Sequence, residues 1–230
     1  MHNTEAFKEI VAARRSVRAF LPQAVDQQTL NSVFETAQRA PSNCNTQPWL
    51  AAVASGDVLQ ALREKVPAAM MQGQISWDFP YSGSYQGVYR DRQYAAANAL
   101  YSSLGIARDD KAARDGQFFK NFEFFGAPHA VFLFLPACFV SEENSGVREA
   151  ADLGMYAQTL MLSMVAHGLG SCPQTALSFT AEVIREELGV SEEYKLMFGL
   201  SFGYPDPAHP SSQALTDRAE LDDCVQFHGK

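Results

Sequence analysis

Two mainly apolar segments constrain the fold of this chain more than any other feature. One is His129-Ala-Val-Phe-Leu-Phe-Leu135, and the other covers residues 194–202. Apolar runs of this length are typical of strands that are covered on both faces of a sheet. Residues 147–167 are apolar almost all round and predict a long helix buried in a core or an interface. Helices and strands therefore alternate along the chain, which indicates an α/β or α+β class.

Apolar spacing, helix caps and prolines predict the other elements. They are helices over residues 4–13 with Thr4 as N-cap, 27–40 capped by Asp26, 58–65 ending before Pro67, 89–104, 109–124 and 180–188, and a strand over residues 49–54. Gly168-Leu-Gly170 ends the long helix and permits a tight turn, and residues 205–230 are interpreted as a non-helical tail.

The stretch from about residue 67 to residue 125 differs from the rest of the chain in its density of aromatic residues. It begins with a Gly- and Ser-rich loop over residues 72–87 and continues into the two helices predicted above. We interpret it as an insertion into a single domain spanning residues 1–230. The alternative is that its aromatic residues belong to an ordinary core.

Composition excludes several classes of protein. Apolar residues make up 47% of the chain and charged residues 19%, which argues against disorder and suggests that a second subunit covers part of the surface. The net charge of −8 makes nucleic acid and anionic membrane poor partners. No apolar run reaches the roughly 18–20 residues of a membrane span, the first residues lack the pattern of a secretory signal, and the four cysteines form no CxxC pair. We therefore expect a cytoplasmic protein without disulfides.

Arg14-Arg-Ser-Val-Arg18 concentrates three of the chain's twelve arginines. If this segment is extended, Arg14, Ser16 and Arg18 lie on one face, and two guanidinium groups with a hydroxyl suit a phosphate. By spacing alone, a solvated basic turn after a helix is the simpler interpretation.

Two further segments carry polar groups without a recognisable catalytic pattern. Ala40-Pro-Ser-Asn-Cys-Asn-Thr-Gln-Pro-Trp49 has amides and hydroxyls that suit a polar heterocycle, but it is also a good structural loop. Gly168-Leu-Gly-Ser-Cys-Pro-Gln-Thr175 permits close backbone approach and matches no nucleotide-binding fingerprint.

Gly199-Leu-Ser-Phe-Gly203 matches the GxSxG motif of serine hydrolases. The residues that follow resist a helix, and the other triad members would have to come from a short tail that holds Asp217, Asp222 and His228. We interpret Ser201 as a small residue of a packed strand. The five histidines are isolated, so no metal site is predicted.

In this order, the segments resemble the FMN-dependent nitroreductase family, in particular its longer bacterial branch that includes nitrobenzoate reductases. The resemblance rests on residues 14–20, 40–49, 125–128, 168–174 and 198–205, and spans nearly the whole chain. It implies an α+β sandwich with a mixed, mainly antiparallel sheet surrounded by helices. It also implies an intertwined homodimer with FMN at two shared sites, and a tail over residues 205–230 that crosses onto the partner.

The same resemblance implies which residues bind FMN. They are Arg14, Arg15, Ser16 and Arg18; Ser42, Asn43 and Asn45 from the other subunit; Asn121; Pro173, Gln174 and Thr175; and Arg218. Arg14 and Ser16 would hold the phosphate, with Arg15 nearby. Arg18 would lie at the N1/O2 edge of the ring, where a cation favours the reduced flavin. Gln213 and Leu215 occupy tail positions where many relatives have basic residues, which leaves Arg218 to complete the phosphate site.

The implied activity is ping-pong reduction of a flat nitroaromatic or quinone-type acceptor by NADH or NADPH. The aromatic stretch would line the substrate pocket. Alternatives are a dehalogenase-like or ene-reducing enzyme of the same fold, and a flavin-binding protein without turnover.

Overall fold

The computed structural model describes residues 3–140 and 145–229. Within these residues one antiparallel sheet forms in the strand order β1 (Leu50–Ser55), β2 (His129–Pro136), β4 (Tyr194–Gly203), β3 (Gly170–Gln174). The two apolar segments are the central strands β2 and β4, which confirms the prediction. The register shifts between Leu133 and Phe134, where β2 carries an irregularity against β4.

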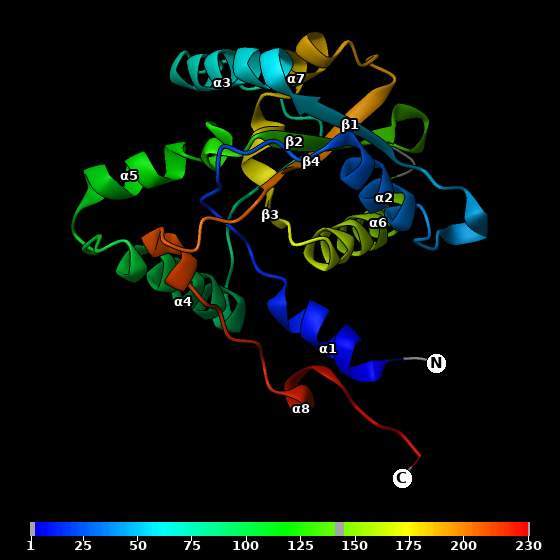
Figure 1. The fold of residues 1–230 in the computed structure, drawn as a ribbon, viewed down its shortest axis with the longest axis vertical. Helices are drawn as coiled ribbons and strands as arrows, with labels where there is room; N and C mark the ends of the chain where they lie inside the picture. The colour runs from blue at the N-terminus through cyan, green and yellow to red at the C-terminus, as the bar shows by residue number, and fades with distance from the viewer. Residues whose placement is uncertain (1–2, 141–144, 230) are drawn as a thin grey trace.

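The sheet lies between two layers of helices, because each face of β2 packs into a separate hydrophobic cluster. Val131, Leu133 and Leu135 belong to one cluster, and Ala130, Phe132 and Phe134 to the other. Helices α2 (Gln27–Ala37) and α6 (Val147–Ala166) cover the first face, and α3 (Gly56–Met71) and α7 (Ala181–Leu188) cover the second (Figure 1). The α+β sandwich is confirmed.

Strand β3 was not predicted from the sequence, in which the glycines at 168 and 170 indicated only the end of a helix and a tight turn. Its backbone pairs with β4, so Gln174 lies opposite Gly199 and Gly170 lies opposite Gly203. A Cβ on Gly170 would lie 2.6 Å from Val17 Cγ2 and 2.9 Å from Pro205 Cγ, so only glycine permits this packing. Local composition suggests a turn, but pairing with a buried central strand decides the conformation.

Two helix boundaries also differ from prediction. Helix α1 (Thr4–Ala13) is capped by Asn3, whose side chain accepts the Ala6 N–H at 3.1 Å, and Thr4 is already helical. Helix α3 continues through Pro67. Its neighbours Val66 and Ala69 are buried in the core, and that burial offsets the lost helical hydrogen bond.

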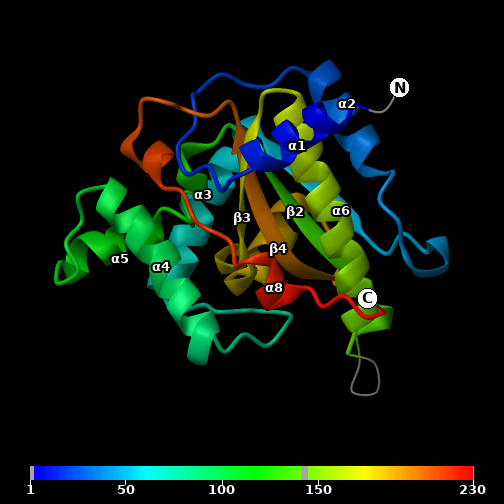
Figure 2. The same cartoon turned by 90° about the horizontal axis from the view of Figure 1, so that it is seen from below.

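The insertion forms a loop followed by a helical hairpin, α4 (Gly87–Ser103) and α5 (Lys111–Phe119), which projects beside the sandwich (Figures 1 and 2). Helix α5 ends at Phe119, so the prediction of a helix to residue 124 was too long. The aromatic residues divide into two sets. Phe122 and Phe124 are fully buried in the sheet core, whereas Tyr89 and Tyr94 on α4 are exposed.

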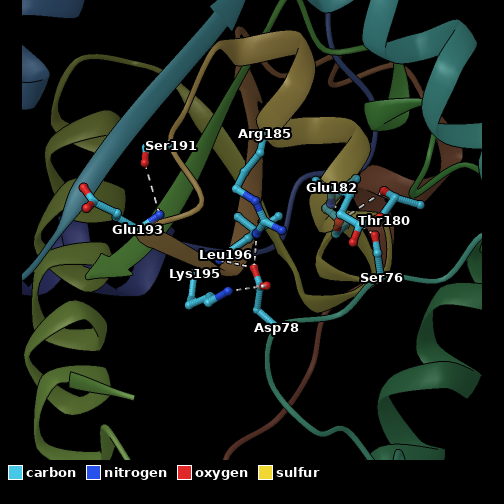
Figure 3. Close-up of polar contacts among 10 residues, drawn as sticks. Ser76, Asp78, Thr180, Glu182, Arg185, Ser191, Glu193, Lys195 and Leu196 are labelled. Atoms are coloured by element: carbon cyan, nitrogen blue, oxygen red, sulfur yellow. Dashed lines mark hydrogen bonds and ion pairs between the residues drawn. The ribbon is translucent and has the colours of Figure 1, made fainter. Parts of the chain in front are cut away.

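A buried ion pair holds the first part of the insertion on the core (Figure 3). Asp78 accepts hydrogen bonds from Arg185 Nη1 and, at 2.7 Å, from the Leu196 N–H, and the Asp78 and Arg185 side chains are only 7% and 8% exposed. Ser76 pairs with the start of α7, where its hydroxyl accepts the Glu182 N–H at 3.1 Å. The loop is therefore fixed directly over the turn that follows β3.

The tail contains a 3-10 turn over Pro210–Gln213, beside α4, and the short helix α8 (Leu221–Cys224) (Figure 2). These two turns correct the expectation of a wholly non-helical tail. Across the part of the chain that the structure describes, none of the helices has the length and apolar character that crossing a bilayer requires.

Candidate functional site

The segment Arg14–Arg18 runs extended along the free edge of β3. The Val17 N–H donates to the Ser171 carbonyl at 2.9 Å, and Ser16 forms an isolated parallel bridge with Ser171. Val17 and Ala19 point into the core and are each 7% exposed, so the intervening residues face the other way. The alternation predicted from the sequence is therefore present, and it directs the basic side chains into one pocket.

This pocket, which we call the arginine pocket, has a volume of about 390 Å³ and lies between the end of α1 and the tail. Its wall comprises Val11, Ala12, Arg14, Arg15, Ser16, Arg18, Ala214, Leu215, Thr216 and Arg218. Four arginines line it, and no acidic side chain does so among the described residues. Such a surplus of guanidinium groups favours an anionic ligand with several oxygens.

No acidic side chain of the described residues compensates the charge of the arginine pocket. Burial lowers the pKa of Arg14 from its usual value, and the positive charge of Arg218 lowers that pKa further. Within residues 3–140 and 145–229, neither Arg14 nor Arg218 forms an ion pair with a carboxylate. Two guanidinium groups that repel each other in a partly buried site are stabilised when an anion binds between them.

Arg15 has a different position from its neighbours. Its Nη1 donates to the Ser212 carbonyl, which ties the tail to the Arg14–Arg18 segment. Arg218 is held by its own neighbourhood, since its Nη1 donates to the Thr216 and Asp217 carbonyls at 3.1 and 2.9 Å. The tail thus supplies the second wall of the pocket, through Ala214, Leu215, Thr216 and Arg218.

Gln174 joins three elements at the end of β3. It is 2% exposed, and its Nε2 donates to the Asn121 carbonyl at 2.8 Å. Its Oε1 accepts hydrogen bonds from the N–H and the hydroxyl of Ser201 on β4. The Gln174 side chain is therefore fully occupied, while Pro173 and Thr175 on either side of it are exposed.

The same contacts exclude the serine hydrolase. Ser201 is fully buried in the middle of β4, and its hydroxyl donates to Gln174 rather than to a histidine. A nucleophile elbow requires an exposed serine at a sharp turn between a strand and a helix. The interpretation of Ser201 as a packed strand residue is confirmed.

Arg18 connects the arginine pocket to the exposed end of β3. It lies close enough to Cys172, one residue before Pro173, for its charge to favour the thiolate. Burial outweighs that effect and raises the pKa of Cys172 to about 11, so the thiol stays protonated. One edge of the sheet therefore presents, in order, Arg14, Arg18 and Pro173.

The loop with Ser42, Asn43 and Asn45 does not reach this edge within one chain. Both views show it beyond α6, on the side of α6 that is opposite to β3 (Figures 1 and 2). Asp152 on α6 fixes it by accepting the Asn43 N–H with both carboxylate oxygens, at 3.2 and 3.1 Å. Cys44 and Asn45 have positive φ angles of 49° and 57°, so the loop has one defined shape.

Sequence reasoning missed Asp152 and the contact between Asn121 and Gln174. Asp152 is 4% exposed, and an acidic residue within an almost wholly apolar helix is a signal that a polar partner exists. No local signal joins Asn121 to Gln174, because that contact depends on how the insertion returns to the sheet.

Comparison with known proteins agrees with this geometry. The model of the Nitroreductase family matches residues 11–204, and the chain belongs to this family. Nitroreductase NfnB of Mycolicibacterium smegmatis is 43% identical over 224 residues, which cover 97% of this chain and 93% of that protein. The 4-nitrobenzoate reductase of Nocardioides sp. is 32% identical over 228 residues, covering 97% of this chain and 90% of that protein.

A solved structure extends the likeness to three dimensions. The crystal structure of the FMN-dependent nitroreductase NfnB from Mycobacterium smegmatis, in complex with NADPH, superposes with a TM-score of 0.91 at 42% sequence identity. The match covers 98% of this chain and 99% of that one.

Proposed function

We propose that this protein is an FMN-dependent NAD(P)H oxidoreductase that reduces nitroaromatic or quinone-type acceptors. The observation that carries the proposal is the arginine pocket, whose four guanidinium groups lack acidic partners among the described residues and continue into the exposed edge of β3. Family membership and the relatives named above support the same activity.

The residues present fit a flavin mononucleotide. Arg14, Ser16 and Arg218 offer two cations and a hydroxyl to a phosphate. Arg18 stands farther along the same edge, where it would stabilise negative charge at the N1/O2 side of the ring. Arg15 would contribute charge nearby while it holds Ser212.

Pro173 would cover one face of the ring, and the backbone N–H of Gln174 or Thr175 would face N5. Since the Gln174 side chain already binds Asn121 and Ser201, we assign Gln174 to shaping this edge through its backbone, and Asn121 to supporting it. Bound FMN supplies the hydride chemistry, so no side chain needs to act as acid or base. Because donor and acceptor would use the same open face, we expect ping-pong kinetics.

The proposed enzyme is a homodimer in the cytosol. The Ser42–Asn45 loop lies far from the arginine pocket of its own chain, as a loop that completes a partner's site would. Helix α1 has no buried residue, and Phe7 on it is 60% exposed, which leaves an apolar surface for a second subunit. The four cysteines are free thiols, which suits a reducing compartment.

Purification and spectroscopy test the proposal. The preparation should show the visible absorption of bound FMN and should oxidise NADPH or NADH when a nitroaromatic or a quinone is added. A colourless protein that cannot be reconstituted with FMN would overturn the proposal, and bound FMN without turnover would identify a flavin-binding protein instead.

Arg14→Ala and Arg18→Ala separate the two ends of the site. Loss of Arg14 should weaken FMN retention by about tenfold or more, the value of a charge-assisted hydrogen bond. Loss of Arg18 should lower the midpoint potential of the bound flavin. Lys65→Ala is the matched control, because it removes one positive charge from α3, which does not line the arginine pocket. It should change neither FMN retention nor the midpoint potential.

A further inference from the structure

A second cationic pocket lies between the two helices of the insertion, away from the arginine pocket. It has a volume of about 490 Å³ and is lined by Tyr94, Asn98 and Tyr101 from α4, by Ile106 and Arg108 from the connection, and by Arg114 from α5. We call it the α4–α5 pocket. It shares no lining residue with the arginine pocket.

Among the described residues, no carboxylate pairs with the guanidinium groups of this pocket. Arg114 Nε is buried without a hydrogen-bond partner. In the described part of the chain, neither Arg108 nor Arg114 pairs with a carboxylate, since Asp110 caps the Ala113 N–H and Asp115 pairs with Lys111. A buried donor left unsatisfied costs about 1–3 kcal/mol, and proteins retain few of them. Arg108 and Arg114 therefore bring positive charge to the pocket, and an anion bound there would neutralise it.

The pocket also has the surfaces that hold a flat ring. Tyr94 and Tyr101 lie about two turns apart on the same side of α4, with alanines at positions 95 and 97 between them. The Tyr94 hydroxyl accepts a hydrogen bond from Arg90 Nε at 3.1 Å, and the Arg90 guanidinium lies 5.1 Å from the centre of the Tyr94 ring. Tyr94 is thereby fixed, and a third cation lies nearby. The volume is within the usual range for small-molecule sites, about 300–1,000 Å³.

The α4–α5 pocket is connected to the arginine pocket along the surface. A third cavity, between α4 and the tail, shares Ala95 and Asn98 with the α4–α5 pocket. The same cavity shares Leu215, Thr216 and Arg218 with the arginine pocket. The hollow surface therefore runs from the arginine pocket across α4 to Arg108 and Arg114.

We infer that the α4–α5 pocket binds the anionic aromatic end of a substrate of this enzyme. This inference rests on the proposed oxidoreductase function. The chemistry that the pocket recognises is a flat ring bearing a carboxylate or a phosphate: the guanidinium groups of Arg108 and Arg114 bind the anion, and the tyrosines contact the ring. The anion belongs either to an aromatic carboxylate acceptor or to the 2′-phosphoadenosine end of NADPH.

Steady-state kinetics of the holoenzyme distinguish the two sources. Each source has a neutral or shortened counterpart that lacks the anion: nitrobenzene for 4-nitrobenzoate, and NADH for NADPH. Arg114→Gln and Arg108→Gln should raise KM for the anionic member of one pair by about tenfold or more, and leave KM for its counterpart unchanged. Lys111→Gln is the control, because Lys111 is an exposed cation on the same helix, with 81% of its side chain accessible.

Calorimetric titration with 4-nitrobenzoate and with 2′,5′-ADP tests the pocket independently of turnover. Binding of either compound that is weakened in Arg114→Gln and unaffected in Lys111→Gln supports the inference, even if the proposed catalytic function fails. The inference is overturned if neither compound binds. It is equally overturned if the Arg114 and Arg108 variants, with normal flavin content and circular dichroism, treat both members of each pair as the unaltered enzyme does.

Discussion

The sheet core and the α4–α5 hairpin are both rich in apolar residues, but they use them in opposite ways. Every residue of β2 from Ala130 to Leu135 is 0% exposed, with helices on both faces. Helices α4 and α5 contain no buried residue, and Tyr89 is 65% exposed. Apolar side chains in the core find their partners within the chain, whereas those of the hairpin face solvent, ligands or another subunit. Stability should therefore depend on the first region and substrate recognition on the second.

The largest expected effect is a large-to-small change in the core. Phe132→Ala should lower the free energy of unfolding by about 3–5 kcal/mol, because it removes a fully buried ring and leaves a cavity. Tyr89→Ala on the hairpin should change it by less than about 0.5 kcal/mol. Urea titration at one fixed protein concentration measures both. A similar loss in the two variants would show that the hairpin is part of the cooperative core.

The junction between the two regions should behave as core. Asp78→Ala leaves the buried Arg185 guanidinium without its carboxylate, so the free energy of unfolding should fall by about 3 kcal/mol. The control is Lys65→Ala, which breaks the pair between the exposed Lys65 and Glu187 and should lower the urea midpoint far less than Asp78→Ala does. If Asp78→Ala is equally mild, the loop is held by Ser76 and the aromatic contacts on Phe179 instead.

How well the sequence predicts each region follows from where the contact partners lie. Apolar runs predict β2, β4 and α6 because burial on both faces is a property of the segment itself. Alternation likewise predicts that Arg14, Ser16 and Arg18 share one face. Strand β3 was missed because its Gly, Ser and Pro residues favour a turn, and only its pairing with the buried strand β4 makes it a strand. The helical continuation through Pro67 was missed because core packing outweighs a local propensity.

The candidate site shows the same division. The arginine pocket could be anticipated from one short segment, and Arg218 followed once the tail lacked other arginines. The hydrogen bonds of the Gln174 side chain to Asn121 and Ser201 could not be anticipated, because they join β3, β4 and the end of the insertion. The α4–α5 pocket carries no motif, because Arg108 and Arg114 approach α4 only through the shape of the hairpin.

Substitution of two glycines by alanine tests the comparison between the core and the hairpin through smaller changes in stability. A Cβ on Gly199 in β4 would lie 2.7 Å from Leu177 Cδ1, so Gly199→Ala should destabilise the protein by about 1–3 kcal/mol. A Cβ on Gly116 in α5 would meet nothing within 4 Å, and Gly116→Ala should stabilise the protein by about 0.4–1 kcal/mol. Opposite signs for one substitution would support the division into a packed core and an open hairpin. Destabilisation by both would indicate that α5 is more tightly packed than its exposure implies.

A further effect is a pH dependence that originates in the core. His129 begins β2, where its Nε2 accepts the Val25 N–H at 2.9 Å, so the neutral ring carries its proton on Nδ1 and donates it to Ser55 Oγ. Burial lowers the pKa of His129 in the folded protein, whereas an unfolded histidine titrates near about 6.5.

Below about pH 6.5 His129 therefore binds a proton in the unfolded chain but not in the folded chain. The free energy of unfolding falls as the pH falls. The loss from this one group is at most about 1.4 kcal/mol per pH unit and ceases once the pH passes the folded pKa. Urea midpoints at about pH 7.5 and about pH 5.5 measure it, with His129→Gln compared with His228→Gln in the exposed tail. His129→Gln should reduce the pH dependence and His228→Gln should preserve it, because only the first residue titrates inside the packed region. An identical pH dependence in both variants would assign the effect to groups outside the core.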